Sequence, residues 1–166
     1  ELAMLRVSTR LDYGVKAMVR LASTYETGPV ALSWVANEER ISMAYLEQLV
    51  IPLKSNGLVI GTRGAKGGYR LSRSPSDITV ADVVEALEGP FVPYFCVESA
   101  DEHRESCCAF EVNCSTRNVW VKVRDQVNTT LRGVTLGDLY LEESRSFMAP
   151  SVIGSGPRPI GLAPVV

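Results

Sequence analysis

Apolar residues near the N-terminus recur with the spacing of one buried helix face. The positions concerned are Leu11, Val15, Met18 and Ala22. They follow one another at intervals of four, three and four residues, which is the period of an amphipathic helix. A helix is therefore predicted from a cap at Ser8 or Thr9 to an end between residues 24 and 28.

Two further helices are predicted before residue 60. A Gly-Pro pair breaks the chain ahead of a short helix expected at about residues 32–39. The next helix takes Ser42 as its N-cap and Gly57 as its stop, and Pro52 should either kink it or end it early. Its apolar stripe consists of Leu46, Leu49, Val50 and Leu53.

A β-hairpin is expected after these helices. Residues 58–60 and 69–71 have the pattern of short strands, and four of the eight residues between them are glycine. Thr79 then caps another helix, which Gly89 ends. Three helices followed by a glycine-tipped hairpin are typical of a winged helix-turn-helix. The predicted fold is thus mainly α with a small β-hairpin wing.

The second half of the chain predicts a long helix at residues 115–132 and a short one from the Thr135 cap through Leu141. The long helix has an apolar stripe formed by Val119, Trp120, Val123, Val127 and Leu131. A chain of this size does not cover so wide a stripe by itself, so we expect a homodimer along this helix. Beyond Ser144 the prolines, glycines and serines predict a flexible tail. The expected divisions are 4–90 for the winged helix-turn-helix, 91–114 for a loop, 115–143 for the dimerisation helix and short last helix, and 144–166 for the tail.

Charge is distributed unevenly along the chain. The net charge is -2 and the pI is near 5.5, values that by themselves argue against a nucleic-acid partner. Between Lys54 and Pro75, however, there is no acidic residue, and the basic ones are Lys54, Arg63, Lys66, Arg70 and Arg73. Because phosphate responds to the local field, the region of the hairpin is a candidate for binding DNA.

The helix that starts at Ser42 would enter the major groove, and the hairpin would reach phosphate or the minor groove. Glutamine can pair with adenine edges, and glutamate can accept from cytosine N4. The predicted DNA-binding residues are Ser42, Ala44, Tyr45, Glu47, Gln48, Arg63, Lys66 and Tyr69. In the alternative interpretation the helices only form a core and the hairpin is an ordinary surface turn.

Four short runs together closely resemble the Rrf2 family of bacterial repressors, which includes the IscR and NsrR types. The runs are YLEQL at residues 45–49, LKSNGLV at 53–59, RGAKGGYRL at 63–71 and ALEG at 86–89. The resemblance extends from about Leu5 to Leu141 and implies a winged-helix, domain-crossed homodimer that binds operator DNA. It also implies that Glu47 discriminates between two classes of DNA site and that Arg63 is the wing arginine. Ala31 is a departure, because relatives often have a serine cap there.

All four cysteines lie between the helix that ends at Gly89 and the long helix: Cys96, Cys107, Cys108 and Cys114. Thiolates gathered in this way are ligands for iron-sulfur clusters or zinc; otherwise they are small buried apolar residues. The resemblance implies an iron-sulfur cluster, 2Fe-2S favoured over 4Fe-4S, with the three ligands Cys96, Cys108 and Cys114. Cys107 could replace Cys108 as ligand or attack it during oxidation.

The fourth ligand is left open by the sequence. Arg117 stands where the IscR type has a histidine, and an arginine side chain stays protonated and cannot bind iron. The NsrR type implies Asp12 of the other subunit, for which a plain helix-surface role is an equal alternative. His103, the only histidine in the chain, is a further candidate.

Other classes of protein were weighed against this hypothesis. No apolar run approaches the length of a membrane span, and no secretory signal opens the chain, so we expect a cytoplasmic protein with no membrane or small-molecule partner. An enzyme with a cysteine nucleophile is not expected, because His103 would be the only candidate base. The remaining alternatives are a repressor without a cluster, switched by thiol oxidation or a protein partner, and a zinc module without a DNA role.

Overall fold

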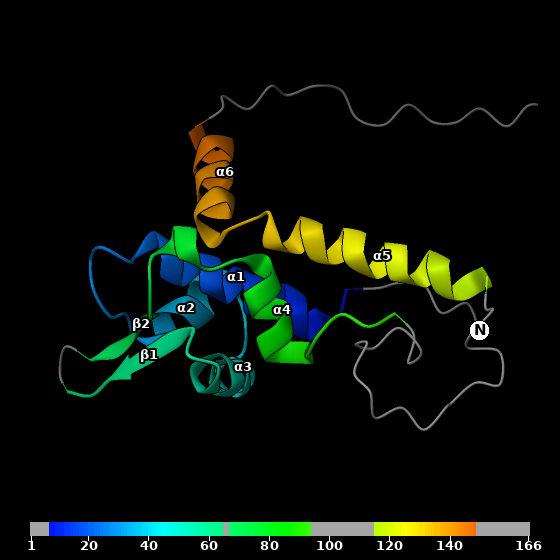
Figure 1. Ribbon diagram of the computed structural model, residues 1–166. Coiled ribbons are helices and arrows are strands. Elements are labelled where there is room, and N and C mark those ends of the chain that lie inside the picture. The colour runs from blue at the N-terminus through cyan, green and yellow to red at the C-terminus, as the bar shows by residue number, and fades with distance from the viewer. Residues whose placement is uncertain (1–6, 65–66, 94–114, 149–166) are drawn as a thin grey trace, which may run out of the picture.

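The computed structural model describes residues 7–64, 67–93 and 115–148. These residues form six α-helices and one two-stranded hairpin, which lies at the edge of the molecule (Figure 1). The elements in chain order are α1 (Thr9–Ser23), α2 (Leu32–Glu39), α3 (Met43–Ser55), β1 (Val59–Thr62), β2 (Gly68–Leu71), a 3-10 turn (Pro75–Asp77), α4 (Val80–Glu88), α5 (Ser115–Arg132) and α6 (Leu136–Met148). The predicted mainly α fold with a hairpin is confirmed.

Helix α1 lies at the centre of the core and contacts α2, α3, α4, β2 and α6. Met18 and Ala22 are buried as predicted, whereas Leu11 and Val15 are half-buried. The other elements close around α1 with fully buried side chains from Leu46, Leu49, Leu53, Val35, Val59, Leu71, Ile78, Val83 and Leu136. Helix α4 comes so close to α1 that a Cβ on Gly14 would lie 2.2 Å from Leu87 Cδ1, so a glycine permits this approach.

Helix starts agree with the predicted caps. The Ser8 hydroxyl accepts from Leu11 N at 3.0 Å, and the Ser42 hydroxyl accepts from Tyr45 N at 3.4 Å. Thr79 and Asp82 form a reciprocal capping box at the start of α4. Helix α2 starts at Ala31 without a side-chain cap, which matches the departure noted in the sequence.

Helix α3 continues past Pro52 to Ser55, so the proline does not end it. A proline inside a helix removes a single N–H donor. Beyond it the Pro52 carbonyl accepts from Asn56 N at 3.0 Å and from Asn56 Nδ2 at 2.9 Å. Leu58 N then donates to Leu53 O at 2.9 Å, which joins α3 directly to the wing.

The wing is an antiparallel pair whose register runs from Val59↔Leu71 to Thr62↔Gly68. Both strands lie close to the predicted residues. The chain before α2 adds a third, short segment, because Val30 N donates to Tyr69 O at 3.0 Å and Tyr69 N donates to Val30 O at 2.8 Å. Gly68 is required here, since a Cβ on it would lie 2.3 Å from Val30 O.

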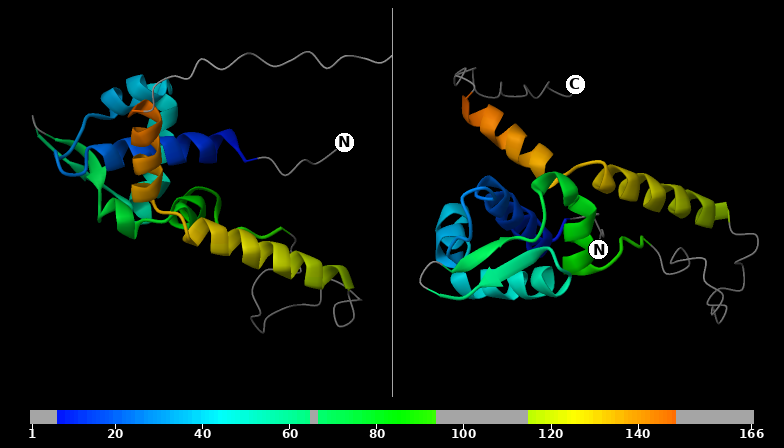
Figure 2. Two further views of the ribbon diagram at one scale, coloured as in Figure 1. Left: turned by 90° about the horizontal axis from the view of Figure 1, so that it is seen from above. Right: turned by 60° about the vertical axis from the view of Figure 1, so that its left-hand side comes forward.

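Helix α5 brings the chain back from a distant first turn to the domain, and α6 then packs against α1 (Figures 1 and 2). The return is held by Val80 N donating to Val134 O and Leu136 N donating to Ile78 O, both at 2.9 Å. The prediction that the last helix ends at Leu141 was too short, because α6 continues to Met148. The residues after Leu141 include no proline before Pro150, so nothing in them breaks a helix that packs against α1.

Candidate nucleic-acid interface and sensor region

One side of α3 is buried and the other is exposed. Leu46, Leu49 and Leu53 point into the core. The opposite side carries half of the predicted DNA-binding residues as exposed side chains: Ser42, Ala44, Glu47 and Gln48. Positions 44, 47, 48 and 51 share this side because of the helix period, and we call them the outward face of α3.

Two exposed apolar side chains accompany these residues and were not predicted. Ile51 is 68% exposed and Met43 is 40% exposed. Ile51 completes the outward face one turn beyond Glu47 and Gln48. An apolar side chain at this place can contact the methyl group of thymine. The helix period counted from Ala44 was the signal that would have identified Ile51.

Tyr45 differs from its neighbours on α3 because it turns toward α1. Its ring lies edge-on to Tyr13, with centroids 6.0 Å apart and planes at 80°, and it is half-buried. Lys16 Nζ lies 5.6 Å from the Tyr13 ring centroid. Tyr45 therefore links the start of α3 to α1, in addition to any contact with DNA.

The wing presents Arg63 as an exposed side chain and Tyr69 as a half-buried one. Lys66 lies outside the described residues. Gly64 has φ +113°, and Gly67 N donates to Gly64 O at 2.9 Å to close the tip. The wing lines most of a cleft of about 340 Å³, and Lys54 lines it from the C-terminal end of α3.

The ion pairs of the described residues lie away from this face. The ion pairs are Lys16–Asp12, Arg20–Glu39, Arg20–Glu143, Arg73–Asp82, Arg124–Asp125 and Arg132–Glu85. Lys54, Arg63 and Arg70 take part in none of them. The α3 and wing surface thus keeps its positive charge for an external anion.

Asp12, the candidate fourth ligand, lies on the exposed side of α1. Its carboxylate accepts from Lys16 Nζ at 2.7 Å, and both side chains are about half exposed. This hydrogen bond to Asp12 raises the pKa of Lys16 above its ordinary value. A metal ion at Asp12 would share this carboxylate with Lys16 or compete with Lys16 for it.

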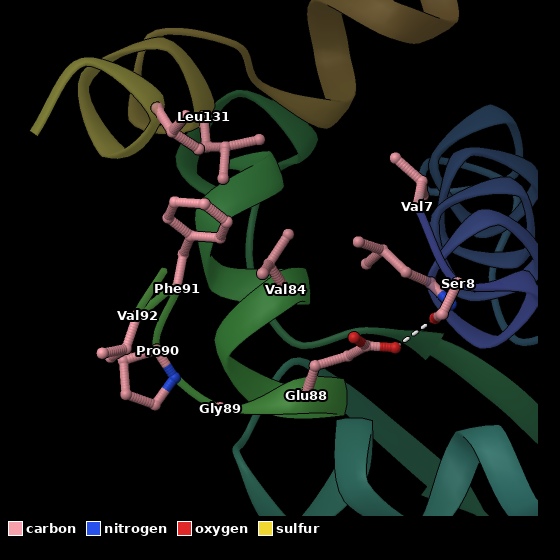
Figure 3. A pocket seen from close by; sticks show the side chains of 11 residues that line it. Val7, Ser8, Val84, Glu88, Gly89, Pro90, Phe91, Val92 and Leu131 are labelled. Carbon is pink, nitrogen blue, oxygen red and sulfur yellow. Dashed lines mark hydrogen bonds between the residues drawn. The ribbon is translucent and has the colours of Figure 1, made fainter. Parts of the chain in front are cut away.

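A pocket of about 370 Å³ lies where the cysteine-bearing segment leaves α4 (Figure 3). Its apolar wall includes Phe91, Val84 and Leu131, and its polar rim is the Ser8 hydroxyl, which donates to the Glu88 carboxylate. The start of α1, the end of α4 and the side of α5 meet here. Residues 89–92 therefore lie beside the start of α1 and the side of α5.

The four cysteines and His103 lie outside the described residues, so their arrangement is not part of the structure. Within residues 7–64, 67–93 and 115–148, no three His, Cys, Asp or Glu side chains come together as metal ligands. Arg117 is in the first turns of α5 and half-buried. None of the helices described is both long enough and apolar enough to cross a membrane.

Comparison with known proteins agrees with the geometry. The family model Rrf2, described as an iron-dependent transcriptional regulator, matches residues 7–142. The HTH-type transcriptional regulator CymR of Bacillus subtilis strain 168 is 37% identical over 135 residues, which cover 81% of this chain and 89% of that protein.

Two solved structures are similar over most of their length. IscR of T. potens has a TM-score of 0.69 and 37% identity, covering 89% of this chain and 94% of that one. The oxidized form of Staphylococcus aureus CymR has a TM-score of 0.62 and 34% identity, covering 82% of this chain and 96% of that one. The winged-helix architecture, the family match and these identities lead to one conclusion: the chain belongs to the Rrf2 family of transcriptional regulators.

Proposed function

We propose that the chain is a repressor that binds duplex operator DNA as a homodimer and is controlled through its cysteine segment. The observation that carries the DNA-binding part is the outward face of α3 beside an unpaired Arg63. Gln48 and Glu47 supply the amide and carboxylate groups that read base edges in the major groove. Arg63 on the wing supplies the positive charge for phosphate or the minor groove.

The homodimer is supported by α5. Val119 is 57% exposed, and the other four residues of the predicted stripe are only half-buried. In the described residues the principal contacts of α5 are with α4. A second copy packed along α5 would cover this stripe and set the spacing of two α3 helices on successive turns of the DNA.

Sensing is assigned to Cys96, Cys108 and Cys114, with Cys107 as the alternative to Cys108 and with Asp12 or His103 as candidates for the fourth ligand. A thiolate set of this kind suits an iron-sulfur cluster, 2Fe-2S favoured. The family description as iron-dependent supports the same assignment. When bound, the cluster would supply a group that responds to oxidation, iron supply or nitric oxide.

The chain itself would transmit the response through contacts between its helices. The cysteine segment joins α4 to α5, and the pocket at its start is walled by α1 and α5. A change in this segment would shift α5 and, through Tyr13 and Tyr45, the start of α3. A coupling free energy of about 1–3 kcal/mol between the two sites is enough for regulation.

The sensor is tested by purifying the protein without oxygen and recording its visible spectrum, iron content and zinc content. Iron and cluster absorption are expected, and both should be lost when Cys96, Cys108 and Cys114 are replaced together by serine. A colourless, iron-free protein that still controls its operator would exclude the cluster. Zinc in its place would point to a structural metal site.

A cluster-free repressor controlled by thiol oxidation is the second candidate. It is favoured by the similarity to a CymR that has been solved in an oxidized form. Under this hypothesis the wild-type protein contains no iron, and a mild oxidant changes its DNA affinity. Serine at Cys107 and Cys108 would then abolish the response to the oxidant.

A further inference from the structure

The cleft between α3 and the wing has the form and charge of an anion site. Lys54 lines one side, Thr62 and Arg63 line the other, and glycines at 61, 64, 67 and 68 form most of the remaining wall. Glycine leaves the backbone accessible at close range. A phosphate group could therefore approach both the side chains and the main chain of the wing.

Lys54 points across the cleft. A Cβ added to Gly61 would lie 3.8 Å from Lys54 Nζ, so the ammonium group lies beside strand β1. A lysine in the last turn of a helix also stabilises the helix dipole. That role alone does not require the ammonium group to lie against the wing.

No acidic side chain neutralises the cleft along the chain that forms it. Residues 54–75 contain none, and Glu47 precedes Lys54 on α3 by two turns, roughly 10 Å along the helix axis. Neither Lys54 nor Arg63 takes part in an ion pair within the described part of the chain. Two unpaired cations thus face one small space.

The position of the cleft identifies the anion. If α3 lies in the major groove and the wing reaches the minor groove, the sugar-phosphate strand that separates the two grooves must pass between them. We propose that this cleft binds one phosphodiester group of the operator backbone, with Lys54 and Arg63 as its cationic contacts. This inference rests on the proposed DNA-binding function and adds Lys54 to the interface.

The first test compares Lys54→Gln with the wild type by fluorescence anisotropy. The probes are a duplex selected from a random library with the wild-type protein and an unrelated duplex. Affinity should fall roughly 3–10-fold on both duplexes, and the slope of log K against log salt should become shallower by about 0.9 for each chain bound. Lys54→Arg should retain most of the affinity. Arg145→Gln on the distant α6 makes the same charge change and should have no effect.

A matched pair at Gly61 tests the place of the anion. Gly61→Ala adds a methyl group at ordinary contact distance, 3.4 Å from Tyr69 Cε1, and should leave affinity unchanged. Gly61→Asp puts a carboxylate beside Lys54 and should weaken binding at least as much as Lys54→Gln. Equal affinity of the two variants would overturn the proposal.

A double-mutant cycle, in which Lys54→Gln is combined with modified DNA, identifies the phosphate that Lys54 contacts. Neutral methylphosphonates are placed one at a time along the selected duplex, and one position should weaken wild-type binding while having little effect on Lys54→Gln. If the wild type binds the duplex and Lys54→Gln binds equally well, the cleft is not a phosphate site although the protein remains a DNA binder. If the wild type binds no duplex, the proposed function itself has failed.

Discussion

Gln48 and Lys54 lie on one helix, yet they should contribute to DNA binding in different ways. Gln48 is exposed in the middle of the outward face of α3, where a side-chain amide can meet a base edge. Lys54 lies at the end of α3 beside the wing, where the proposed contact is with the backbone of DNA alone. A base contact carries sequence information, and a phosphate contact carries affinity without it.

Replacing Gln48 with alanine should therefore reduce discrimination between operators. We expect a loss of about 1–3 kcal/mol on the selected duplex, little change on an unrelated duplex, and an unchanged salt slope. The measurement is anisotropy with both duplexes over a range of salt. An equal loss on both duplexes would show that Gln48 does not read a base.

At the scale of elements, the position of α6 depends on Arg20. This side chain on α1 pairs with Glu39 of α2 at 2.7 Å and with Glu143 of α6 at 3.1 Å. Arg20 and Glu39 are only 22% and 13% exposed. Leu136 at the start of α6 is completely buried, so α6 completes the core to which the helix-turn-helix belongs.

Arg20→Met should lower the free energy of unfolding by about 1–3 kcal/mol, because Glu39 loses its partner in a largely buried place. Arg132→Met is the matched control. Arg132 pairs with Glu85 at a similar 2.8 Å, but these side chains are 64% and 46% exposed, so at most about 1 kcal/mol should be lost. Urea unfolding measures both variants, and equal losses would contradict the role given to Arg20.

The start of α6 also has a helix cap whose contribution to stability depends on pH. Thr135 Oγ1 and Thr135 N donate to Asp138 Oδ2 at 2.7 and 3.0 Å. These hydrogen bonds hold the pKa of Asp138 below its ordinary value of 3.8. A carboxyl group whose pKa is lower in the folded state stabilises the fold above its unfolded pKa, and this stabilisation is lost as pH falls through the folded pKa.

Asp138→Asn should consequently lower Tm at pH 7 by a small amount, and its difference from the wild type should shrink as the pH falls below about 3.8. Thermal unfolding followed by circular dichroism between pH 7 and pH 3 measures this. Glu142→Gln is the control, because it removes a carboxylate from the same helix away from its cap. A Tm difference between variant and wild type that stays constant over the whole pH range would contradict this role of Asp138.

At the scale of the whole molecule, the long α5 projects from the domain, and its first turns form the end furthest from α6 (Figure 2). Its apolar side chains have only part of their surface covered by α4. The cysteine segment ends where α5 begins, so the proposed sensor and the proposed dimer contact lie on consecutive parts of the chain. Dimer geometry and cysteine chemistry should then respond together.

Val119→Glu should convert the dimer into a monomer and weaken operator binding, since it puts a charge into the stripe that the second copy would cover. The measurement is sedimentation equilibrium together with anisotropy. Leu141→Glu is the control, because Leu141 is a similarly exposed apolar residue (52%) on α6. A dimeric Val119→Glu protein would show that the chain pairs through another surface.

The sequence by itself determined the helices, their caps and the wing. Helix period, Ser42, Thr79 and the glycines are local signals, because hydrogen bonds of caps and turns form between residues close in the chain. The candidate residues on α3 and the wing followed from the same patterns and the family resemblance. Ile51 was not among them because it is apolar. Lys54 was recognised only as part of the basic stretch, because its place at the end of a helix does not show that it lies beside the wing.

Only the tertiary structure decided which distant segments meet. The Val30–Tyr69 bridge, the Tyr13–Tyr45 contact, the return of α6 to α1 and the cleft that joins Lys54 to the wing all connect residues that no local pattern relates. The physical reason is that such contacts depend on how several buried faces pack together. The sequence of a segment indicates which of its sides is apolar, but not which other segment covers that side. The length of α6 was predicted too short for this reason. Packing against α1 stabilises the helix beyond Leu141, where the sequence no longer has a clear apolar period.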